Sequence, residues 1–219
     1  TSFNPVPSQI ISSFKTLKEF ETPFFLYEEK RLRENCQRFK NAFTKHFPDF
    51  HPLYAVKANS NPDVLKIIMD EGYGFDSSSE AESWLTKKLG HWGMYTGNYT
   101  PASELKVAVD ANLMLNLDDI SMLDFLEEIG VPEWISFRIN PGAGEGNMGF
   151  AGPDAKYGVP FEKAAEAYKK AAEMGVKKFA IHMMTGSNVC DEEYFATIVE
   201  RLFEIVAEIK EKSGVEIEI

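Results

Sequence analysis

Short apolar runs alternate with amphipathic helices along most of this chain, and this alternation constrains the fold more than any other feature. From Pro52 onwards six β/α units follow one another, and a seventh strand is expected at 215–219. Strict alternation is typical of a parallel sheet with right-handed crossovers. An open doubly wound sheet and a (β/α)8 barrel both fit the pattern. A barrel needs eight strands in about 250 residues, so we expect an incomplete parallel barrel that lacks its last part.

The pattern divides the chain into an N-terminal segment, residues 1–51, and a partial barrel, residues 52–219. The first segment is predicted to hold a strand at Phe24–Tyr27 and a helix at about 28–46. Strands of the barrel are expected at 52–57, 73–76, 93–96, 113–117, 134–139, 179–184 and 215–219. Later helices are expected at 118–129, about 161–174 and about 191–212. The last helix is expected to bury Phe195, Ile198, Val199, Leu202, Ile205, Val206 and Ile209.

Capping residues mark where three of the helices between these strands begin. Asn61 and Pro62 are suited to the N-cap and first helical positions. Ser79-Glu80-Ala81-Glu82 has the form of a capping box. Thr100-Pro101 is expected to cap a further helix. These signals predict the residues at which the three helices begin.

The charge balance excludes two classes of protein. Lys and Arg number 23 and Asp and Glu number 34, a formal net charge of −11. A nucleic-acid binder or a polybasic membrane-surface protein needs the opposite balance. No run approaches the roughly 18 apolar residues of a membrane span. The first residues lack a signal-peptide pattern, and Cys36 and Cys190 imply no disulfide framework, so we expect a cytoplasmic protein.

Polar residues gather where the predicted strands end, which is where parallel β/α folds place their sites. They are Lys57–Asn59, Asp76–Ser78, Gly97-Asn98, Asn116, Arg138–Asn140 and His182–Asn188. We expect no metal site, because the sequence has no clustered His, Cys and carboxylate spacing. It also has no G-x-S-x-G turn to expose a nucleophilic serine.

Lys57 is the sharpest of these signals. It ends the otherwise apolar stretch Tyr54-Ala55-Val56-Lys57 and shares a face with Leu53 and Ala55 by alternation. Burial at a barrel mouth lowers the pKa of a lysine and supplies the neutral amine that forms a Schiff base. The alternative is a strand-end lysine whose ammonium reaches water. Position alone leaves both interpretations open.

Five motifs in order resemble the alanine-racemase-like (fold type III) pyridoxal-phosphate decarboxylases. That family includes the diaminopimelate, ornithine, arginine and carboxynorspermidine decarboxylases. The motifs are Tyr54–Pro62, which resembles the cofactor-lysine motif, then Gly74–Glu82, Arg138–Pro141, Ala155–Gly158 and Gly186-Ser187. The resemblance runs from about Thr22 to the last residue. It implies a racemase-type barrel without its last strands and without the family's C-terminal β domain.

The resemblance also implies roles for individual residues. Lys57 would carry pyridoxal 5′-phosphate as a Schiff base, and Asp76 would lie near the lysine and the cofactor ring. Glu82 would do likewise, although its capping-box spacing explains it without chemistry. Arg138 would reach the cofactor, or it would tie strand ends together through carboxylates. Ser187, with the amides near Gly186, would help to hold the phosphate.

One position departs from the family pattern. The family usually has a ring-stacking histidine two residues before the glycine of the last motif, where this chain has Met184. Methionine packs on an aromatic face through its sulfur but cannot titrate or donate a hydrogen bond. His182 would face the same side as Met184, one layer deeper, either compensating for it or serving as an ordinary interior histidine.

The glycine-rich stretch Gly144–Gly149 fits G-x-G-x-x-G, but no helix follows it directly, so the dinucleotide-binding context fails. It belongs to a connection of about 20 residues, which is long for a β/α loop and typical of a lid or a subunit contact. We therefore expect no dinucleotide site there.

Three functions are compatible with these features. The first is decarboxylation of a basic or dibasic amino acid, with meso-diaminopimelate as the substrate because Arg138–Pro141 and Ala155–Gly158 are closest to that branch. In that case we expect a homodimer in the intact protein and no activity from these 219 residues alone. The second is a non-catalytic single-barrel pyridoxal-phosphate-binding protein. The third is an unrelated β/α scaffold or binding protein.

Overall fold

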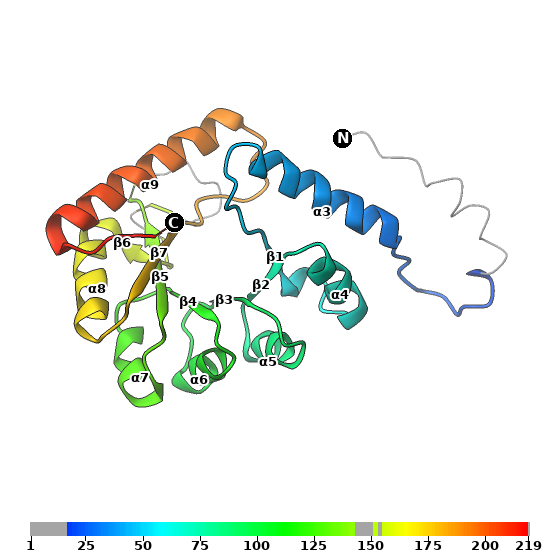
Figure 1. Ribbon diagram of the computed structural model, residues 1–219, viewed down its shortest axis with the longest axis horizontal. Coiled ribbons are helices and arrows are strands. Elements are labelled where there is room, and N and C mark those ends of the chain that lie inside the picture. The colour runs from blue at the N-terminus through cyan, green and yellow to red at the C-terminus, as the bar shows by residue number, and fades with distance from the viewer. Residues whose placement is uncertain (1–16, 143–150, 153–154, 219) are drawn as a thin grey trace.

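The computed structural model describes residues 17–142, 151–152 and 155–218, and in them a single parallel sheet is flanked by helices (Figure 1). The strands are β1 (Leu53–Ala55), β2 (Gly74–Ser77), β3 (Gly93–Thr96), β4 (Met114–Leu117), β5 (Trp134–Asn140), β6 (Val159–Pro160) and β7 (Lys178–His182). The helices are α3 (Glu29–Thr44), α4 (Pro62–Asp70), α5 (Glu80–Lys88), α6 (Ala102–Asp110), α7 (Met122–Ile129), α8 (Phe161–Glu173) and α9 (Glu192–Ser213). A short 3-10 turn, η1 (Val56–Ala58), follows β1.

The strand order confirms the incomplete barrel. Strands β1 to β5 lie side by side in chain order, β7 continues the sheet beside β5, and the short β6 pairs with the end of β5. Every pairing is parallel. In Figure 1 helices α4 to α8 follow one another in an arc outside the strands, as the helices of a barrel do. A doubly wound sheet would instead reverse its strand order at a switch point.

Two of the three predicted caps form as expected. The Asn61 side chain accepts a hydrogen bond from the Asp63 amide at 2.9 Å, and Pro62 takes the first helical position of α4. Ser79 accepts from the Glu82 amide at the start of α5. The prediction for Thr100 was wrong, because its hydroxyl lies 2.9 Å from the Tyr95 hydroxyl instead of capping α6.

The core lies between the outer face of the sheet and the helices. Strand residues Tyr95, Leu115, Ile135 and Phe137 are fully buried there against residues of α6, α7 and α8. A smaller cluster joins β1 and β2 to α3 and α4; it contains Cys36, Val56, Val64, Leu65, Ile68, Tyr73 and Phe75. The Tyr73 hydroxyl donates to the Cys36 carbonyl at 2.9 Å. This buried bond fastens α3 to the first part of the sheet.

Two predicted strands are not strands in the structure. Phe24–Tyr27 is extended but pairs with no described strand, and Phe25 is 89% exposed. Residues 215–218 also form no strand, although Val215 is buried and the Glu218 amide donates to the Phe179 carbonyl at 2.7 Å. Both stretches have strand-like sequences. They fail as strands because a strand requires a neighbour along its length.

Other boundaries differ from the sequence prediction as well. Helix α7 begins at Met122, four residues later than expected, and β6 was not predicted. Helix α9 buries Ile205 and Ile209, but Phe195 is 54% exposed and Val199 is 49% exposed. In the described part of the chain the sheet ends at β7, so the first half of α9 has little apolar surface to cover.

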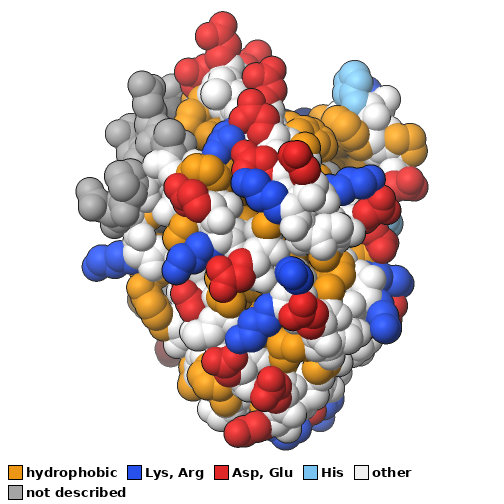
Figure 2. Space-filling model, turned by 90° about the vertical axis from the view of Figure 1, so that its left-hand side faces the viewer, with side chains coloured by type: hydrophobic (Ala, Val, Ile, Leu, Met, Phe, Trp, Pro, Cys, Tyr) orange, Lys and Arg blue, Asp and Glu red, His pale blue; other side chains and the backbone are white. Residues whose placement is uncertain are grey.

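The outer surface carries charges of both signs. Figure 2 shows the side of the molecule on which α8 and α9 lie, where acidic and basic side chains are interspersed with smaller apolar areas. Many of the charges form ion pairs one helical turn apart, such as Lys212 with Glu208 at 2.8 Å. Within the described ranges no helix combines the length and apolarity needed to cross a membrane.

The first prediction concerns Tyr168 in α8, which is fully buried and donates a hydrogen bond to the Ala180 carbonyl of β7 at 2.7 Å. We expect Tyr168→Phe to lower the free energy of unfolding by about 1–2 kcal/mol, because the buried carbonyl loses its partner. Chemical denaturation measures this. Tyr27→Phe, on a half-exposed ring, is the control and should stay within about 0.5 kcal/mol. Equal losses of stability in the two variants would contradict a stabilising hydrogen bond from Tyr168 to Ala180.

Candidate functional site

The inner face of the sheet is polar where the outer face is apolar. The register pairs Thr96 with Asn116 and Asn116 with Ser136 on three neighbouring strands. Because side chains alternate along a strand, and the residues between them pack against the helices, these three side chains face the barrel interior. They form one polar row across β3, β4 and β5.

A second row, one layer nearer the strand ends, is ionisable. Arg138 on β5 is paired in register with His182 on β7. The Arg138 guanidinium donates to the Asn98 side-chain oxygen at 3.1 Å and lies 3.9 Å from the Asp118 carboxylate. Arg138 and Asp118 are both at least 90% buried. Of the two interpretations left open for Arg138, the contact with Asp118 supports the one in which it ties strand ends together.

Buried polar atoms without hydrogen-bond partners concentrate on this inner face. In the described residues they are Asp76 Oδ1, Thr96 Oγ1, both side-chain amide atoms of Asn116, Ser136 Oγ, Arg138 Nη2 and His182 Nδ1. They come from β2, β3, β4, β5 and β7. Native proteins pair nearly all buried polar groups, and each one left unpaired costs roughly 1–3 kcal/mol. These atoms are therefore available to water or to a polar ligand inside the barrel.

Lys57 and Asp76 lie close together at one edge of this face. Lys57 stands in η1, two residues after the end of β1, and its side chain is exposed. Asp76 is on β2 opposite Ala55. Burial raises the pKa of the Asp76 carboxyl, and the Lys57 ammonium acts in the opposite direction. The predicted lysine and aspartate thus interact electrostatically. The expectation that Lys57 ends the strand and is buried at the barrel mouth was wrong, because β1 ends at Ala55 and the Lys57 side chain is exposed.

Glu82 has a structural function that the sequence had left open. Its carboxylate accepts a hydrogen bond from the Ser78 amide at 2.7 Å, while the Glu82 amide donates to Ser79. This reciprocal arrangement is the capping box that begins α5, shifted by one residue at its far end. Glu82 still contributes to the site, because its negative charge raises the pKa of Asp76.

His182 is neutral in this environment. Burial, with the nearby positive charge of Arg138, lowers the pKa of the imidazole to about 4. Burial likewise lowers the pKa of Arg138 and raises that of Asp118, and each of the two opposes the shift of the other. The second row therefore combines an uncharged histidine with a desolvated ion pair.

Met184 and Ser187 lie beyond the end of β7. Both are half-buried, and in the described residues neither makes a hydrogen bond to Lys57, Asp76 or Arg138. The turn between them packs against α9, where the Tyr194 hydroxyl donates to Thr185 at 2.8 Å. The structure thus brings together Lys57 with Asp76 and Arg138 with His182. The functions of Met184 and Ser187 stay predictions.

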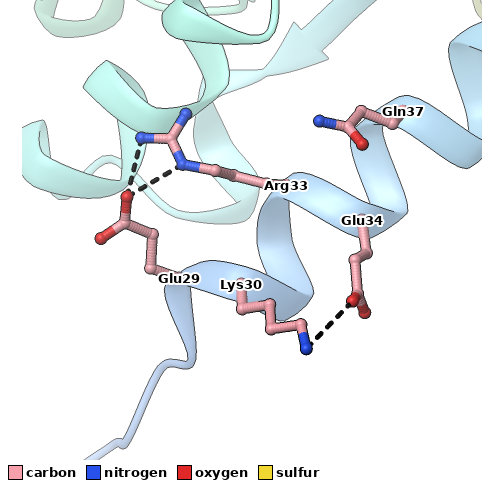
Figure 3. A pocket seen from close by; sticks show the side chains of 5 residues that line it. All are labelled: Glu29, Lys30, Arg33, Glu34 and Gln37. Atoms are coloured by element: carbon pink, nitrogen blue, oxygen red, sulfur yellow. Dashed lines mark hydrogen bonds and ion pairs between the residues drawn. The ribbon is translucent and has the colours of Figure 1, made fainter.

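Two surface hollows are lined by none of Lys57, Asp76, Arg138 and His182. One, of about 510 Å³, is lined by Glu29, Lys30, Arg33, Glu34 and Gln37 of α3 (Figure 3). Its charges are engaged in pairs, because Arg33 binds Glu29 at 2.7 Å and also reaches Asp70 and Glu71 at the end of α4. The other, of about 490 Å³, lies where α8 begins. The glycine-rich stretch 144–149 lies outside the described residues.

Sequence reasoning missed Thr96, Ser136 and Asp118. The first two carry no charge and sit inside predicted strands, so nothing singled them out as functional. Period-two alternation was the available signal, since each stands two residues from another inward position on its strand. Asp118 had been assigned to the start of a helix that begins four residues later.

Comparison with known proteins agrees with this geometry. The family model "Pyridoxal-dependent decarboxylase, pyridoxal binding domain" matches residues 29–219. Diaminopimelate decarboxylase of Methanothermobacter thermautotrophicus is 37% identical over 208 residues, which are 91% of this chain and 48% of that protein. The solved diaminopimelate decarboxylase from M. jannaschi has a TM-score of 0.82 at 25% identity and covers 94% of this chain and 51% of its own. Lysine decarboxylase from Selenomonas ruminantium gives a TM-score of 0.78 at 25% identity, over 99% of this chain and 55% of its own. The chain spans about half the length of these relatives.

The second prediction follows from the buried carboxyl of Asp76. Its raised pKa means that the charged form destabilises the fold above that pKa and that this cost fades as the pH falls towards the unfolded value. We expect Asp76→Asn to raise the free energy of unfolding at pH 7 by about 0.5–2 kcal/mol, as replacements at functional sites commonly do. Urea unfolding at pH 7 and at lower pH measures the difference, which should shrink on acidification.

The control for this experiment is Asp63→Asn, on an exposed residue of α4. It should show neither the gain at neutral pH nor its loss in acid. An Asp76→Asn protein that is less stable than the wild type at pH 7 would contradict the electrostatic description of the site.

Proposed function

Because the chain belongs to the pyridoxal-dependent decarboxylase family, we propose that the intact protein removes the carboxylate of a basic or dibasic amino acid. The cofactor is pyridoxal 5′-phosphate. We propose meso-diaminopimelate as the substrate and lysine as the product. The relatives named for that activity support this choice, as do the motifs Arg138–Pro141 and Ala155–Gly158.

One observation supports the proposal above the others. An exposed lysine, Lys57, stands at the edge of an inner face on which five strands present buried polar atoms without partners. These residues fit the cofactor, which combines a carbonyl group, a ring hydroxyl, a ring nitrogen and a phosphate. A non-catalytic carrier would require only the lysine and a phosphate site. The ionisable row of Arg138 and His182 favours catalysis.

Lys57, Asp76 and Arg138 have different functions in the proposed site. Lys57 provides the amine that holds the cofactor covalently. Asp76 places a negative charge beside that amine, and Arg138 places a positive charge on the inner face. When bound, the cofactor accepts the electron pair that remains when carbon dioxide leaves.

The residues beyond β7 complete the proposed cradle. Ser187 would offer its hydroxyl to the cofactor's phosphate, and Met184 would offer its sulfur to the ring, where relatives of this type usually have a histidine. His182 is uncharged, so it acts as a hydrogen-bonding group and does not repel the cationic parts of the site. Glu82 contributes through its charge and its cap.

The third prediction identifies the cofactor lysine. Borohydride reduction of the intact protein, followed by peptide mass mapping, should place the pyridoxyl group on Lys57. Lys57→Ala should lower decarboxylation by at least about a thousandfold, because the covalent route is lost. Lys66→Ala, on an exposed lysine of α4, is the matched control and should leave the activity unchanged. A label on another lysine would refute the assignment.

The fourth prediction concerns the substrate. Carbon dioxide release should be measured with meso-diaminopimelate, lysine, ornithine and arginine at equal concentrations. We expect kcat/KM for meso-diaminopimelate to exceed the others by at least about tenfold, a difference of about 1.4 kcal/mol in transition-state binding. A preference for lysine or ornithine would keep the reaction class and change the substrate. No release with any of them would favour the non-catalytic carrier.

The domain division, the oligomeric state and the location are part of the same proposal. We propose that residues 52–219 form the cofactor-binding unit and that residues 1–51 lead into it. The resemblance to the family also supports a cytoplasmic homodimer. Sedimentation of the intact protein distinguishes a dimer from a monomer.

A further inference from the structure

Residues 155–158, which we call the strap, are fastened to the end of the sheet at two points. The Gly158 amide donates to the Asp118 carboxylate at 3.1 Å. The Tyr99 hydroxyl donates to the Lys156 carbonyl at 2.8 Å. The strap is thus bound to the loops that follow β3 and β4, which are separated from it by about 40 residues or more in sequence.

Tyr157, which stands between these two hydrogen-bonded residues, contacts Arg138 of the inner face. The guanidinium carbon of Arg138 lies 5.1 Å from the centroid of the Tyr157 ring, and the centroids of the Tyr99 and Tyr157 rings are 5.9 Å apart with the rings tilted. Gly158 has a φ of +90°, and a Cβ there would lie 3.1 Å from the Arg138 carbonyl. The strap can approach this closely only because the residue after Tyr157 is glycine.

Arg138 is therefore held from several sides. Asn98 accepts from Nη1, the Asp118 carboxylate lies 3.9 Å away, and the guanidinium carbon lies over the Tyr157 ring. Nη2 stays buried and without a partner in the described residues, next in register to His182. A guanidinium that lies over an aromatic ring and is hydrogen-bonded through Nη1 has little rotational freedom, so Nη2 points in a fixed direction.

We propose that the strap positions Arg138 and that Tyr157, acting through its ring, is a positioning residue of the inner-face site. What the site holds rests on the proposed function, whereas the positioning does not. Arg138 is the charged group beside His182, and Asp118 and Tyr157 face Arg138 in turn. On the outer side of β7, α8 presents Tyr168, which is bonded to the backbone. His182 is thus a reporter of where the Arg138 charge sits.

The test is an NMR titration of histidine ring signals in the intact protein, with His182 assigned from a His182→Gln variant. In the wild type we expect His182 to stay neutral down to about pH 4. In Tyr157→Leu the ring is lost and Arg138 moves, so the pKa of His182 should rise by about one unit, a tenfold change in proton affinity. Tyr157→Phe keeps the ring and should titrate like the wild type.

The outcomes separate positioning from a merely structural effect. A Tyr157→Leu protein with unchanged stability and an unchanged His182 titration would overturn the proposal, as would a Tyr157→Phe shift equal to that of Tyr157→Leu. If Tyr157→Leu does not fold, Tyr99→Phe removes only the bond to the Lys156 carbonyl. It should raise the pKa of His182 in the same direction by a smaller amount, and no rise would again overturn the proposal.

The experiment also stands apart from the proposed function. The titration is measured without cofactor or substrate, so a protein that shows the shifts but binds no pyridoxal phosphate would contradict only the proposed function. A protein that is labelled at Lys57 but shows no shift in Tyr157→Leu would contradict only the positioning by the strap.

Discussion

The structure depends on one geometric constraint, the alternation of side chains across parallel strands. On every central strand, one set of residues packs against the helices and the other faces the interior. Tyr95, Leu115 and Ile135 belong to the first set, and their neighbours in sequence belong to the second. Because the helices bury enough apolar surface to hold the sheet together, the inner face is free to carry polar groups. Stability and chemistry are thereby assigned to opposite faces of the same few strands.

The electrostatics of the inner face follow from burial. Desolvation raises the pKa of Asp76 and Asp118 and lowers that of Arg138 and His182, so every ionisable group there resists its charged form. Opposite charges act against three of these shifts: Lys57 near Asp76, and Arg138 and Asp118 near each other. At His182 the positive charge of Arg138 adds to the effect of burial, and together they lower the pKa to about 4. The distribution of charge thus results from which residues the register brings together, and no single residue determines it.

The sequence was sufficient for the order of the elements and for the first members of the site. Periodicity and caps located six strands. Motif spacing identified Lys57, Asp76 and Arg138, and position at a strand end identified His182; the structure pairs Lys57 with Asp76 and Arg138 with His182. Phe24–Tyr27 and Val215–Glu218 were wrong as strands because strand formation depends on a partner that local sequence does not reveal. Thr96, Ser136 and the Tyr157 contact were missed because an uncharged residue acquires a function only from its neighbours in space.

The buried polar atoms without partners on the inner face couple the stability of the fold to the binding of water or a ligand. If each costs about 1–3 kcal/mol when nothing contacts it, the set together is comparable with the whole stability of a domain, about 5–15 kcal/mol. Water or a polar ligand must therefore satisfy most of them in solution. A ligand that binds only the folded chain adds stability in proportion to the logarithm of its concentration over its dissociation constant. Lys57 would hold the ligand, and Tyr157 would fix the direction of the unpaired Arg138 donor. Both residues then act on the folding equilibrium through ligand binding. The same contacts at the strand ends therefore contribute both to the orientation of the site and to the stability of the barrel.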